Sequence, residues 1–336
     1  MKILVTGCAG FIGSNFIRFL LKENSHVELT HLDALTYAGN LESIKDLLDH
    51  PRHKFHKGNI NDQELVSKLV EDVEMIINFA AESHVDRSID GPKSFIEANV
   101  NGTFTLLEAA RRAKNKIRFV QISTDEVYGS LGPIGSFTEE STLAPNSPYS
   151  ASKASSDLLV RAYHHTYGLD TITTRCSNNY GPCQFPEKLI PLMIQNARAD
   201  KNLPVYGDGL NVRDWIHVED HSRGVWAAAT KGKPGEVYNL GSDNEWPNIE
   251  IVKLILKHLG KSSDLIKYVK DRPGHDRRYA IDASKSKREL DWKPLVSFDA
   301  GLRSTIDWYL ANDAWLHSVT SGDYQSFYDR WYRERR

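Results

Sequence analysis

Short runs of apolar residues alternate along the first half of the chain with longer stretches that have helical spacing. The short runs predict strands at Ile3–Thr6, Val27–Leu32, Lys54–Lys57, Met75–Phe79, Ile117–Ile122 and Thr171–Thr174. The longer stretches predict helices at Ile12–Glu23, Glu64–Glu71 and Pro92–Ala113. Such alternation, with strands that are apolar on both faces, indicates a parallel sheet covered by helices on each side. We therefore expect a doubly wound α/β fold.

The alternation weakens after about Arg175, where prolines and glycines become frequent. Further helices are predicted at Leu189–Arg198, Ile249–Leu259 and Ala300–Leu310. We expect residues 1–175 to form the first domain and residues 176–336 to form mainly a smaller C-terminal α/β lobe that binds substrate. The strand-like run Val237–Leu240 indicates that about 211–242 rejoins the first domain, so the two parts are interleaved.

The composition is that of an ordinary globular protein, with 40% apolar and 26% charged residues. The net charge of −2 gives no sign of a nucleic-acid-binding surface. No stretch approaches about 18 uncharged apolar residues and the chain opens on a strand-like run, so we expect no membrane span, no leader and a cytoplasmic protein. Three cysteines without CxxC spacing and 13 scattered histidines indicate neither disulfides nor a metal site.

Three glycines follow the first predicted strand and open the first predicted helix. Gly7 permits a tight turn, Gly10 lets the backbone approach a diphosphate, and Gly13 allows close packing of helix and strand. The N–H groups at the start of the helix can then bind an anion. This context predicts a Rossmann-type dinucleotide-binding site.

An acidic residue, Asp33, ends the second predicted strand, 20 residues after Gly13. A carboxylate at this position can accept hydrogen bonds from both ribose hydroxyls and would repel a 2′-phosphate. The segment His31–Asn40 contains no arginine. The cofactor is therefore predicted to be NAD and not NADP.

Two groups of ionisable residues suggest acid–base chemistry. Tyr149 and Lys153 lie four residues apart on one helix face, where the ammonium and a nicotinamide charge favour tyrosinate. Ser123-Thr124-Asp125-Glu126 lies at the carboxyl end of the fifth predicted strand, where doubly wound sheets bind their ligands. Neighbouring side chains on an extended segment point to different sides, so the two acids can serve different atoms of one substrate.

These residues carry a specific resemblance over nearly the whole chain. The sequence resembles the extended short-chain dehydrogenase/reductase superfamily and, within it, the dTDP-glucose 4,6-dehydratases. Besides the glycine turn, the matching segments are Asp33–Gly39, Ala80–Ser88, Ser123–Gly129, Tyr149–Lys153, Arg175–Pro182 and Asp271–His275.

The resemblance implies a hydro-lyase reaction that yields dTDP-4-keto-6-deoxyglucose and water without net consumption of NAD. Tyr149, assisted by Lys153 and Thr124, would take the proton of the carbon-4 hydroxyl while a hydride passes to NAD. Glu126 would remove the carbon-5 proton, and protonated Asp125 would donate to the departing carbon-6 hydroxyl. The hydride would then return to carbon 6.

The resemblance also implies two sets of binding residues. The expected cofactor contacts are Gly7, Gly10, Phe11, Ile12, Gly13, Asp33, Thr36, Asn59, Ile60, Phe79, Ala80, Ala81, Tyr149, Lys153 and Asn179. The expected contacts to the nucleotide sugar are Ser83, Thr124, Asn178, Lys188, Leu189, Pro204, Tyr206, Arg213, Asn248, Arg272 and His275. Arg213 and Arg272 suit the diphosphate because a guanidinium binds phosphate oxygens in pairs.

The sequence departs from the family pattern at Asn59, where an Asp is usual, at Ala98, where a Thr is expected, and in a short loop between Gly129 and Pro145. A UDP- or CDP-sugar 4,6-dehydratase remains an alternative. A less favoured alternative is a sugar-nucleotide epimerase or decarboxylase, which needs no acid at carbon 6. Another is a non-catalytic NAD- or sugar-nucleotide-binding protein, which would not need Tyr149. A homodimer is expected, with Pro92–Ala113 and Tyr149–Tyr167 packed against their symmetry mates.

Overall fold

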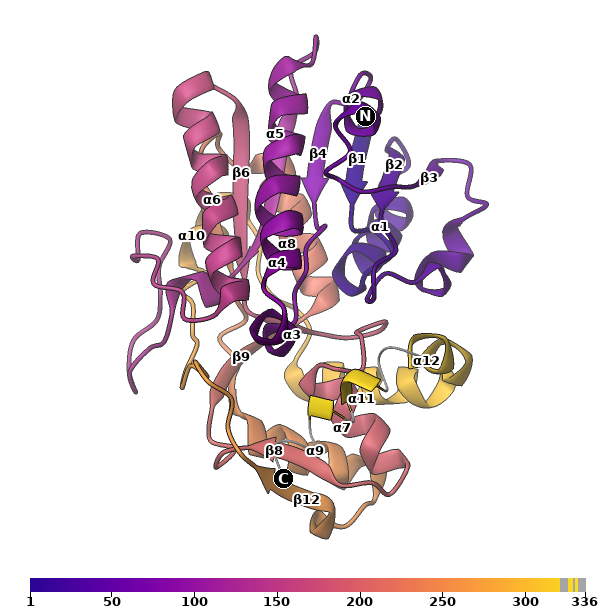
Figure 1. The fold of residues 1–336 in the computed structure, drawn as a ribbon, viewed down its shortest axis with the longest axis vertical. Helices are drawn as coiled ribbons and strands as arrows, with labels where there is room; N and C mark the ends of the chain where they lie inside the picture. Colours follow the sequence, from indigo (N-terminus) through magenta and orange to yellow (C-terminus); the bar gives the residue numbers. More distant parts are fainter. Residues whose placement is uncertain (321–325, 329, 332–336) are drawn as a thin grey trace.

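A computed structural model describes residues 1–320, 326–328, 330 and 331 of the chain (Figure 1). The remaining positions of the expected second lobe, including its end at residue 336, lie outside the described residues. The main sheet has seven strands, all parallel, in the order β10-β6-β5-β4-β1-β2-β3. Its strands are β1 (Lys2–Thr6), β2 (Glu28–Asp33), β3 (His53–Lys57), β4 (Met75–Asn78), β5 (Arg118–Thr124), β6 (Asp170–Cys176) and β10 (Val237–Leu240).

Helices cover both faces of this sheet. One face carries α1 (Phe11–Glu23) and α8 (Val218–Lys231), and the other carries α2 (Gln63–Leu69), α5 (Gly102–Arg112) and α6 (Pro148–Tyr167). The predicted doubly wound α/β fold is therefore confirmed, and so are the strands and helices predicted in the first half, apart from one helix described below.

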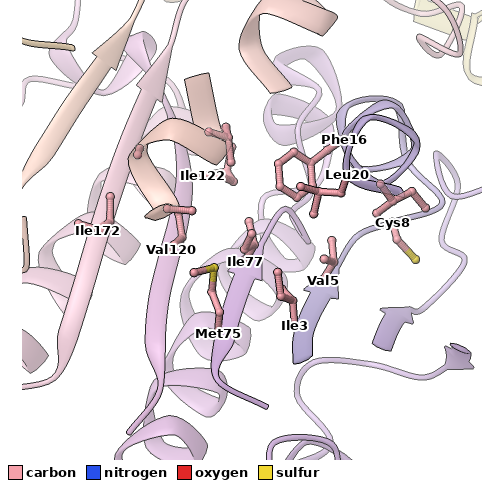
Figure 2. Packing of buried hydrophobic residues seen from close by; sticks show 14 of the residues in the cluster. Ile3, Val5, Cys8, Phe16, Leu20, Met75, Ile77, Val120, Ile122 and Ile172 are labelled. Atoms are coloured by element: carbon pink, nitrogen blue, oxygen red, sulfur yellow. The ribbon is translucent and has the colours of Figure 1, made fainter. Parts of the chain in front are cut away.

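The side chains of β1 show why the strands read as apolar on both faces. Ile3 and Val5 pack in one cluster with Phe16 of α1, as Figure 2 shows, and residues of α8 complete that cluster. Leu4, which lies between them, belongs to a separate cluster formed with apolar residues of α2, α5 and α6. Successive side chains of a strand point to opposite faces, so one strand contributes to two cores.

The predicted helix Pro92–Ala113 is not continuous. It comprises α4 (Lys93–Phe95), a π-helical segment η2 (Ile96–Asn101) and α5. Within η2 the buried Asn99 pairs with the backbone of Glu82, accepting from its N–H at 2.9 Å and donating to its carbonyl at 3.0 Å, and it also donates to Ser152 Oγ at 2.7 Å. The apolar spacing of the sequence predicts a continuous helix. It does not reveal the π-helical segment, because that segment is associated with tertiary hydrogen bonds.

The second half of the chain builds two small sheets that the sequence did not predict. One contains β7 (Asn178–Tyr180), β9 (Val212–His217) and β11 (Glu245–Pro247), and the other contains β8 (Leu203–Tyr206) and β12 (Ile266–Val269). The helices beside them are α7 (Leu189–Arg198), α9 (Asn248–Leu259), α11 (Phe298–Ala311) and α12 (Asp313–Val319). A third apolar core joins these helices and strands. The three helices predicted in this half are confirmed as α7, α9 and α11.

The chain passes from the second lobe back to the main sheet. Helix α8 packs on α1, and β10 pairs with β6 and forms one edge of the main sheet, where α10 (Ser284–Leu290) covers it. The shorter elements are α3 (Val85–Asp90), η1 (Leu41–Leu47), η3 (Asp125–Tyr128) and η4 (Ser263–Leu265). Among the described helices none is long and apolar enough to cross a membrane.

A buried histidine in β2 makes the fold sensitive to acid. His31 is fully buried, its ring lies 4.2 Å from that of His53, and neither ring nitrogen has a hydrogen-bond partner among the described residues. Burial, together with the neighbouring His53, lowers the pKa of His31 well below its ordinary value. The unfolded chain therefore binds a proton that the folded chain resists, and stability falls as the pH drops below about 6.5.

We expect His31→Phe to reduce this dependence. Between about pH 6.5 and pH 5 the slope of the unfolding free energy against pH should fall by up to about 1.4 kcal/mol per pH unit, which corresponds to one proton. Urea unfolding over this range measures the slope. His26→Phe is the control, because His26 is exposed. An unchanged slope in His31→Phe would contradict the explanation.

Candidate active site

A cavity of about 280 Å³ lies where the strands of the main sheet end. Gly7 follows β1, Asp33 ends β2, Phe79 follows β4 and Thr124 ends β5, and all four line the cavity. Every residue expected to contact the cofactor lines it as well: Gly7, Gly10, Phe11, Ile12, Gly13, Asp33, Thr36, Asn59, Ile60, Phe79, Ala80, Ala81, Tyr149, Lys153 and Asn179. The carboxyl edge of a doubly wound sheet is where such folds bind ligands.

The expected substrate contacts divide into two groups. Ser83, Thr124, Asn178 and Lys188 line the cavity. The others are not part of its lining and belong to the second lobe or to the segment after β12: Leu189, Pro204, Tyr206, Arg213, Asn248, Arg272 and His275. The structure thus brings together the residues expected to contact the cofactor, and it distributes the expected substrate contacts over both halves of the chain.

The glycine turn is shaped by two different constraints. Gly7 has φ +71°, and a Cβ there would lie 2.6 Å from Ala80 N, while a Cβ on Gly13 would clash with the Gly7 carbonyl oxygen. Gly10, the residue before α1, has an ordinary extended backbone, and a Cβ on it would meet only Gly7 O at 3.4 Å. The protein itself would therefore accept a side chain at Gly10, whereas a diphosphate bound at the start of α1 would not.

Asp33 is held in place by the backbone. Its Oδ2 accepts from Ala9 N–H and its Oδ1 from Leu35 N–H, both at 2.8 Å. Burial raises the pKa of Asp33, although these two donors oppose the shift. The carboxyl group is thereby fixed at the cavity wall, in the position in which a doubly wound fold binds the adenosine ribose.

Asn59 also lines the cavity, and its side-chain oxygen accepts from Asn61 N–H at 2.9 Å. The oxygen therefore closes its own turn, and the amide N–H groups are the donors left for a ligand. An ionised Asp at this position would offer only acceptors, so the departure from the family pattern changes the hydrogen bonds available at this part of the cavity wall.

Several polar atoms of the cavity wall lack hydrogen bonds. They are buried, have no hydrogen-bond partner among the described residues, and include Ser123 Oγ, Asp125 Oδ2, Asn178 Oδ1, Asn179 Oδ1 and Gln184 Oε1. Most buried polar atoms in proteins are paired. A polar ligand with hydroxyl and amide groups, such as the ribose and carboxamide of NAD, fits this set of acceptors.

The acid–base residues meet where β5 and α6 approach the cavity. Helix α6 begins with Pro148 after a capping box at Ser147, which places Tyr149 in its first turn. Lys153 lies one turn later and donates from Nζ to the Ile122 carbonyl at 2.7 Å. After β5, Thr124 Oγ1 accepts from Glu126 N–H at 3.2 Å and bends the chain into η3.

Burial raises the pKa of both Asp125 and Glu126, but the charged neighbours of the two groups act in opposite directions. Burial raises the pKa of Asp125 well above its ordinary value, and Glu126 and Asp214 add to the rise. Burial also raises the pKa of Glu126, but Arg272, Lys188 and Arg213 oppose it. The environment therefore favours a neutral Asp125 beside a more readily ionised Glu126.

Burial affects both members of the Tyr–Lys pair. It raises the pKa of Tyr149 well above its ordinary value, and the negative charge of Glu126 adds to this. Burial also lowers the pKa of Lys153. The expected tyrosinate form relies on the charge of a bound nicotinamide as well as on the ammonium, and it stays a prediction.

Three positive side chains surround Glu126. Arg213 donates to the Asp276 carbonyl at 2.8 Å and lies over the Tyr279 ring, and Lys188 donates to the Ser83 carbonyl at 2.7 Å. Arg272 donates to Asp86 Oδ1 at 3.0 Å. They come from the second lobe and the segment beyond it, so the charge of the site depends on how the two lobes meet.

Two buried acidic residues of the site were not identified from the sequence. Asp86 accepts from Arg272 and, through its other oxygen, from the Tyr206 hydroxyl at 2.9 Å. Glu187 lines the cavity and accepts from Arg87 Nε at 2.8 Å. Asp86 lies within the matching segment Ala80–Ser88, which was the only available signal. Its partners are more than a hundred residues away, so spacing could not reveal them.

The fold and this site define a class. A Rossmann-type sheet with a glycine turn, an acid at the end of β2 and a Tyr–Lys pair on α6 is the arrangement of a short-chain dehydrogenase/reductase. The family model described as "GDP-mannose 4,6 dehydratase" matches residues 4–305.

Individual relatives narrow the class. A dTDP-glucose 4,6-dehydratase of Xanthomonas campestris is 53% identical over 96% of this chain and 97% of its own length. The structure of a Bacillus anthracis dTDP-glucose 4,6-dehydratase in complex with NAD has a TM-score of 0.89 and 53% identity, covering 95% of this chain and 99% of the other. A Streptomyces venezuelae enzyme of the same name has a TM-score of 0.92 and 49% identity, covering 95% and 100%. The chain belongs to the dTDP-glucose 4,6-dehydratase family.

The contrast between Gly10 and Gly13 can be tested directly. We expect Gly10→Ala to fold with an unchanged unfolding temperature but to bind NAD at least about tenfold more weakly, because the Cβ occupies the diphosphate position. Gly13→Ala should lose about 1–3 kcal/mol of stability from overpacking. Calorimetry on the cofactor-free protein measures both the unfolding temperature and the affinity for NAD. Normal NAD affinity in a folded Gly10→Ala variant would contradict the assignment.

Proposed function

We propose that this protein is a hydro-lyase that converts dTDP-glucose into dTDP-4-keto-6-deoxyglucose and water. The observation that carries the proposal is the adjacent pair of the buried Asp125 and the partly buried Glu126, with one oxygen of Asp125 unpartnered among the described residues, beside Tyr149 and Lys153 in the same cavity. Chemistry at two neighbouring sugar carbons needs one acid and one base in addition to the group that oxidises carbon 4. The identity to characterised dehydratases supports the same activity.

NAD is the proposed cofactor, and when bound it accepts a hydride from sugar carbon 4 and later returns it to carbon 6. Tyr149 takes the proton of the carbon-4 hydroxyl, with Thr124 and Lys153 beside it. The bound, positively charged nicotinamide opposes the burial that raises the pKa of Tyr149.

The carboxyl pair then performs the elimination. The ketone at carbon 4 acidifies the proton on carbon 5, and Glu126 removes it. Asp125, whose buried position favours the protonated form, donates its proton to the leaving hydroxyl on carbon 6. After the hydride returns to carbon 6, Glu126 gives its proton back to carbon 5. The three groups are restored once Tyr149 releases the proton of the carbon-4 hydroxyl to solvent and Asp125 regains one from solvent.

Binding of the nucleotide sugar uses both lobes. Arg213 and Arg272 are proposed to hold the diphosphate, with Lys188 close to the sugar. The remaining proposed contacts are Ser83, Asn178, Leu189, Pro204, Tyr206, Asn248 and His275. A UDP- or CDP-linked sugar is the alternative substrate, since none of the described contacts distinguishes the bases.

The protein is proposed to be a cytoplasmic homodimer. Three apolar side chains on η2, α5 and α6 support the dimer: Ile96, Phe104 and Leu158 are 47%, 42% and 58% exposed. These neighbouring helices could pack against their symmetry mates as a four-helix bundle. Native mass measurement should give the dimer at micromolar concentration, and a monomer alone would contradict it.

The reaction is tested by incubating the NAD-loaded protein with dTDP-glucose and UDP-glucose separately. We expect the alkaline chromophore of a 4-keto sugar to form faster from dTDP-glucose. A folded, NAD-loaded protein that forms no 4-keto-6-deoxy sugar from any glucose nucleotide would refute the proposal. Equal rates with both substrates would still support the proposed reaction but would contradict a preference for the dTDP base.

The role of Asp125 is tested with a better leaving group. Fluoride leaves without protonation, so Asp125→Asn should eliminate water about 10²–10⁴-fold more slowly but release fluoride from dTDP-6-deoxy-6-fluoroglucose at close to the normal rate. Glu126→Gln should lose both reactions, because each requires removal of the carbon-5 proton. Electrode measurement of fluoride and the 4-keto chromophore report the two rates. Normal water elimination in Asp125→Asn would show that another group is the acid.

A further inference from the structure

The described end of the chain lies across the junction of the two lobes. In Figure 1 these residues are the short yellow pieces between α3 and α7. Phe327 is buried, and the Arg87 guanidinium lies 4.3 Å from the centre of its ring. Trp331 stacks on Phe327 at 5.6 Å with an interplanar angle of 18°. Arg87 belongs to α3, so one side of this segment packs on the cofactor lobe.

The other side of the segment contacts the substrate lobe. Asn196 of α7 donates to the Tyr328 hydroxyl at 3.0 Å, and Trp331 donates from Nε1 to the hydroxyl of Tyr206 on β8 at 2.8 Å. Trp331 is only 7% exposed. The segment therefore bridges two elements that are far apart in sequence.

The bond from Trp331 continues into the site. Tyr206 donates to Asp86 Oδ2 at 2.9 Å, and Arg272 donates to Asp86 Oδ1 at 3.0 Å. An indole N–H can only donate, and an ionised carboxylate can only accept. The single hydroxyl proton of Tyr206 must therefore point to Asp86. The Tyr206 oxygen must accept the hydrogen bond from the indole N–H of Trp331. The direction of every bond in this chain is fixed.

Asp86 is suited to remain the ionised acceptor. Burial alone would raise its pKa, but His84 and Arg272 together with the Tyr206 hydrogen bond bring the pKa of Asp86 below its ordinary value. Arg272 Nε is buried and has no partner among the described residues, so this side chain keeps a donor for a ligand while Asp86 holds its other end.

We propose that Trp331 is a positioning residue, which orients Tyr206 and, through Asp86, Arg272 for the diphosphate end of the nucleotide sugar. This inference rests on the proposed function. Trp331 is buried and its N–H is directed at the Tyr206 hydroxyl, so the proposed role is exerted through Tyr206 and not on the substrate itself. Loss of its donor leaves the Tyr206 hydroxyl oxygen with one partner fewer and frees Tyr206 to turn away from Asp86.

Two substitutions separate the donor from the ring. Trp331→Phe keeps an aromatic ring against Phe327 but removes the N–H. Trp331→His keeps an N–H at the corresponding position of a five-membered ring and removes the outer ring. We expect Trp331→Phe to raise the KM for dTDP-glucose and the Kd for dTDP about fivefold, the size of one neutral hydrogen bond, with kcat within about twofold. Trp331→His should retain the wild-type Kd within about twofold.

A second background tests the route of the effect. With Tyr206→Phe already present, Trp331→Phe should weaken dTDP binding by less than about twofold further, because the acceptor of its bond is gone. An undiminished effect in this background, or no effect of Trp331→Phe in the wild-type background, would overturn the proposal. Equal weakening by the Phe and His variants would show that Trp331 acts only by packing, and would overturn it too.

A matched control measures general destabilisation. Trp292 is also buried and also donates through Nε1, here to the Asp220 carbonyl at 3.1 Å, but it belongs to the apolar cluster between the main sheet and α8, whereas Tyr206 lies on β8 of a separate sheet. Trp292→Phe should lower the unfolding temperature without changing the Kd for dTDP. NAD affinity should be unchanged in every variant. Wild-type protein that binds NAD but neither binds dTDP nor converts dTDP-glucose would refute the proposed function and this inference with it. Normal wild-type binding with an unaffected Trp331→Phe would refute the inference alone.

Discussion

Asp125 and Glu126 occupy adjacent positions at the end of β5, where burial disfavours two negative charges. Much of the site's arrangement follows from this constraint. Burial favours the neutral form of Asp125, and the burial of Glu126 is opposed by Arg213, Arg272 and Lys188 from elements that follow β6 in the chain. The second half of the chain therefore provides the positive charge that favours a carboxylate beside a neutral acid in the cavity.

The sequence predicted the parts of the fold that depend on local pattern. Apolar runs flanked by helical spacing predicted the main sheet, and the three glycines with Asp33 predicted the cofactor wall, because these signals need no knowledge of distant contacts. The strands of the small sheets were missed because β7 and β11 have only three residues each. The π-helical segment was missed because it is formed for the tertiary hydrogen bonds of Asn99.

The chemistry of the site could be predicted only in part. The Tyr–Lys pair and the two acids were visible as motifs, and the structure brings all of them to one cavity. The burial of Tyr149, which raises its pKa, was not foreseen, since spacing shows a neighbouring charge but not the loss of solvent. Asp86 and Trp331 were not identified for a related reason. Each gains its role from partners that folding alone brings near.

The position of β10 has a consequence for any attempt to divide the molecule. β10 pairs with β6 and forms one edge of the main sheet. In the chain, however, it comes after helices and strands of the second lobe. A fragment ending after β6 would carry the whole glycine turn but would expose the unpaired backbone of an inner strand, which invites strand addition from other chains. The cofactor half is thus continuous in space but cannot be isolated by a single cut.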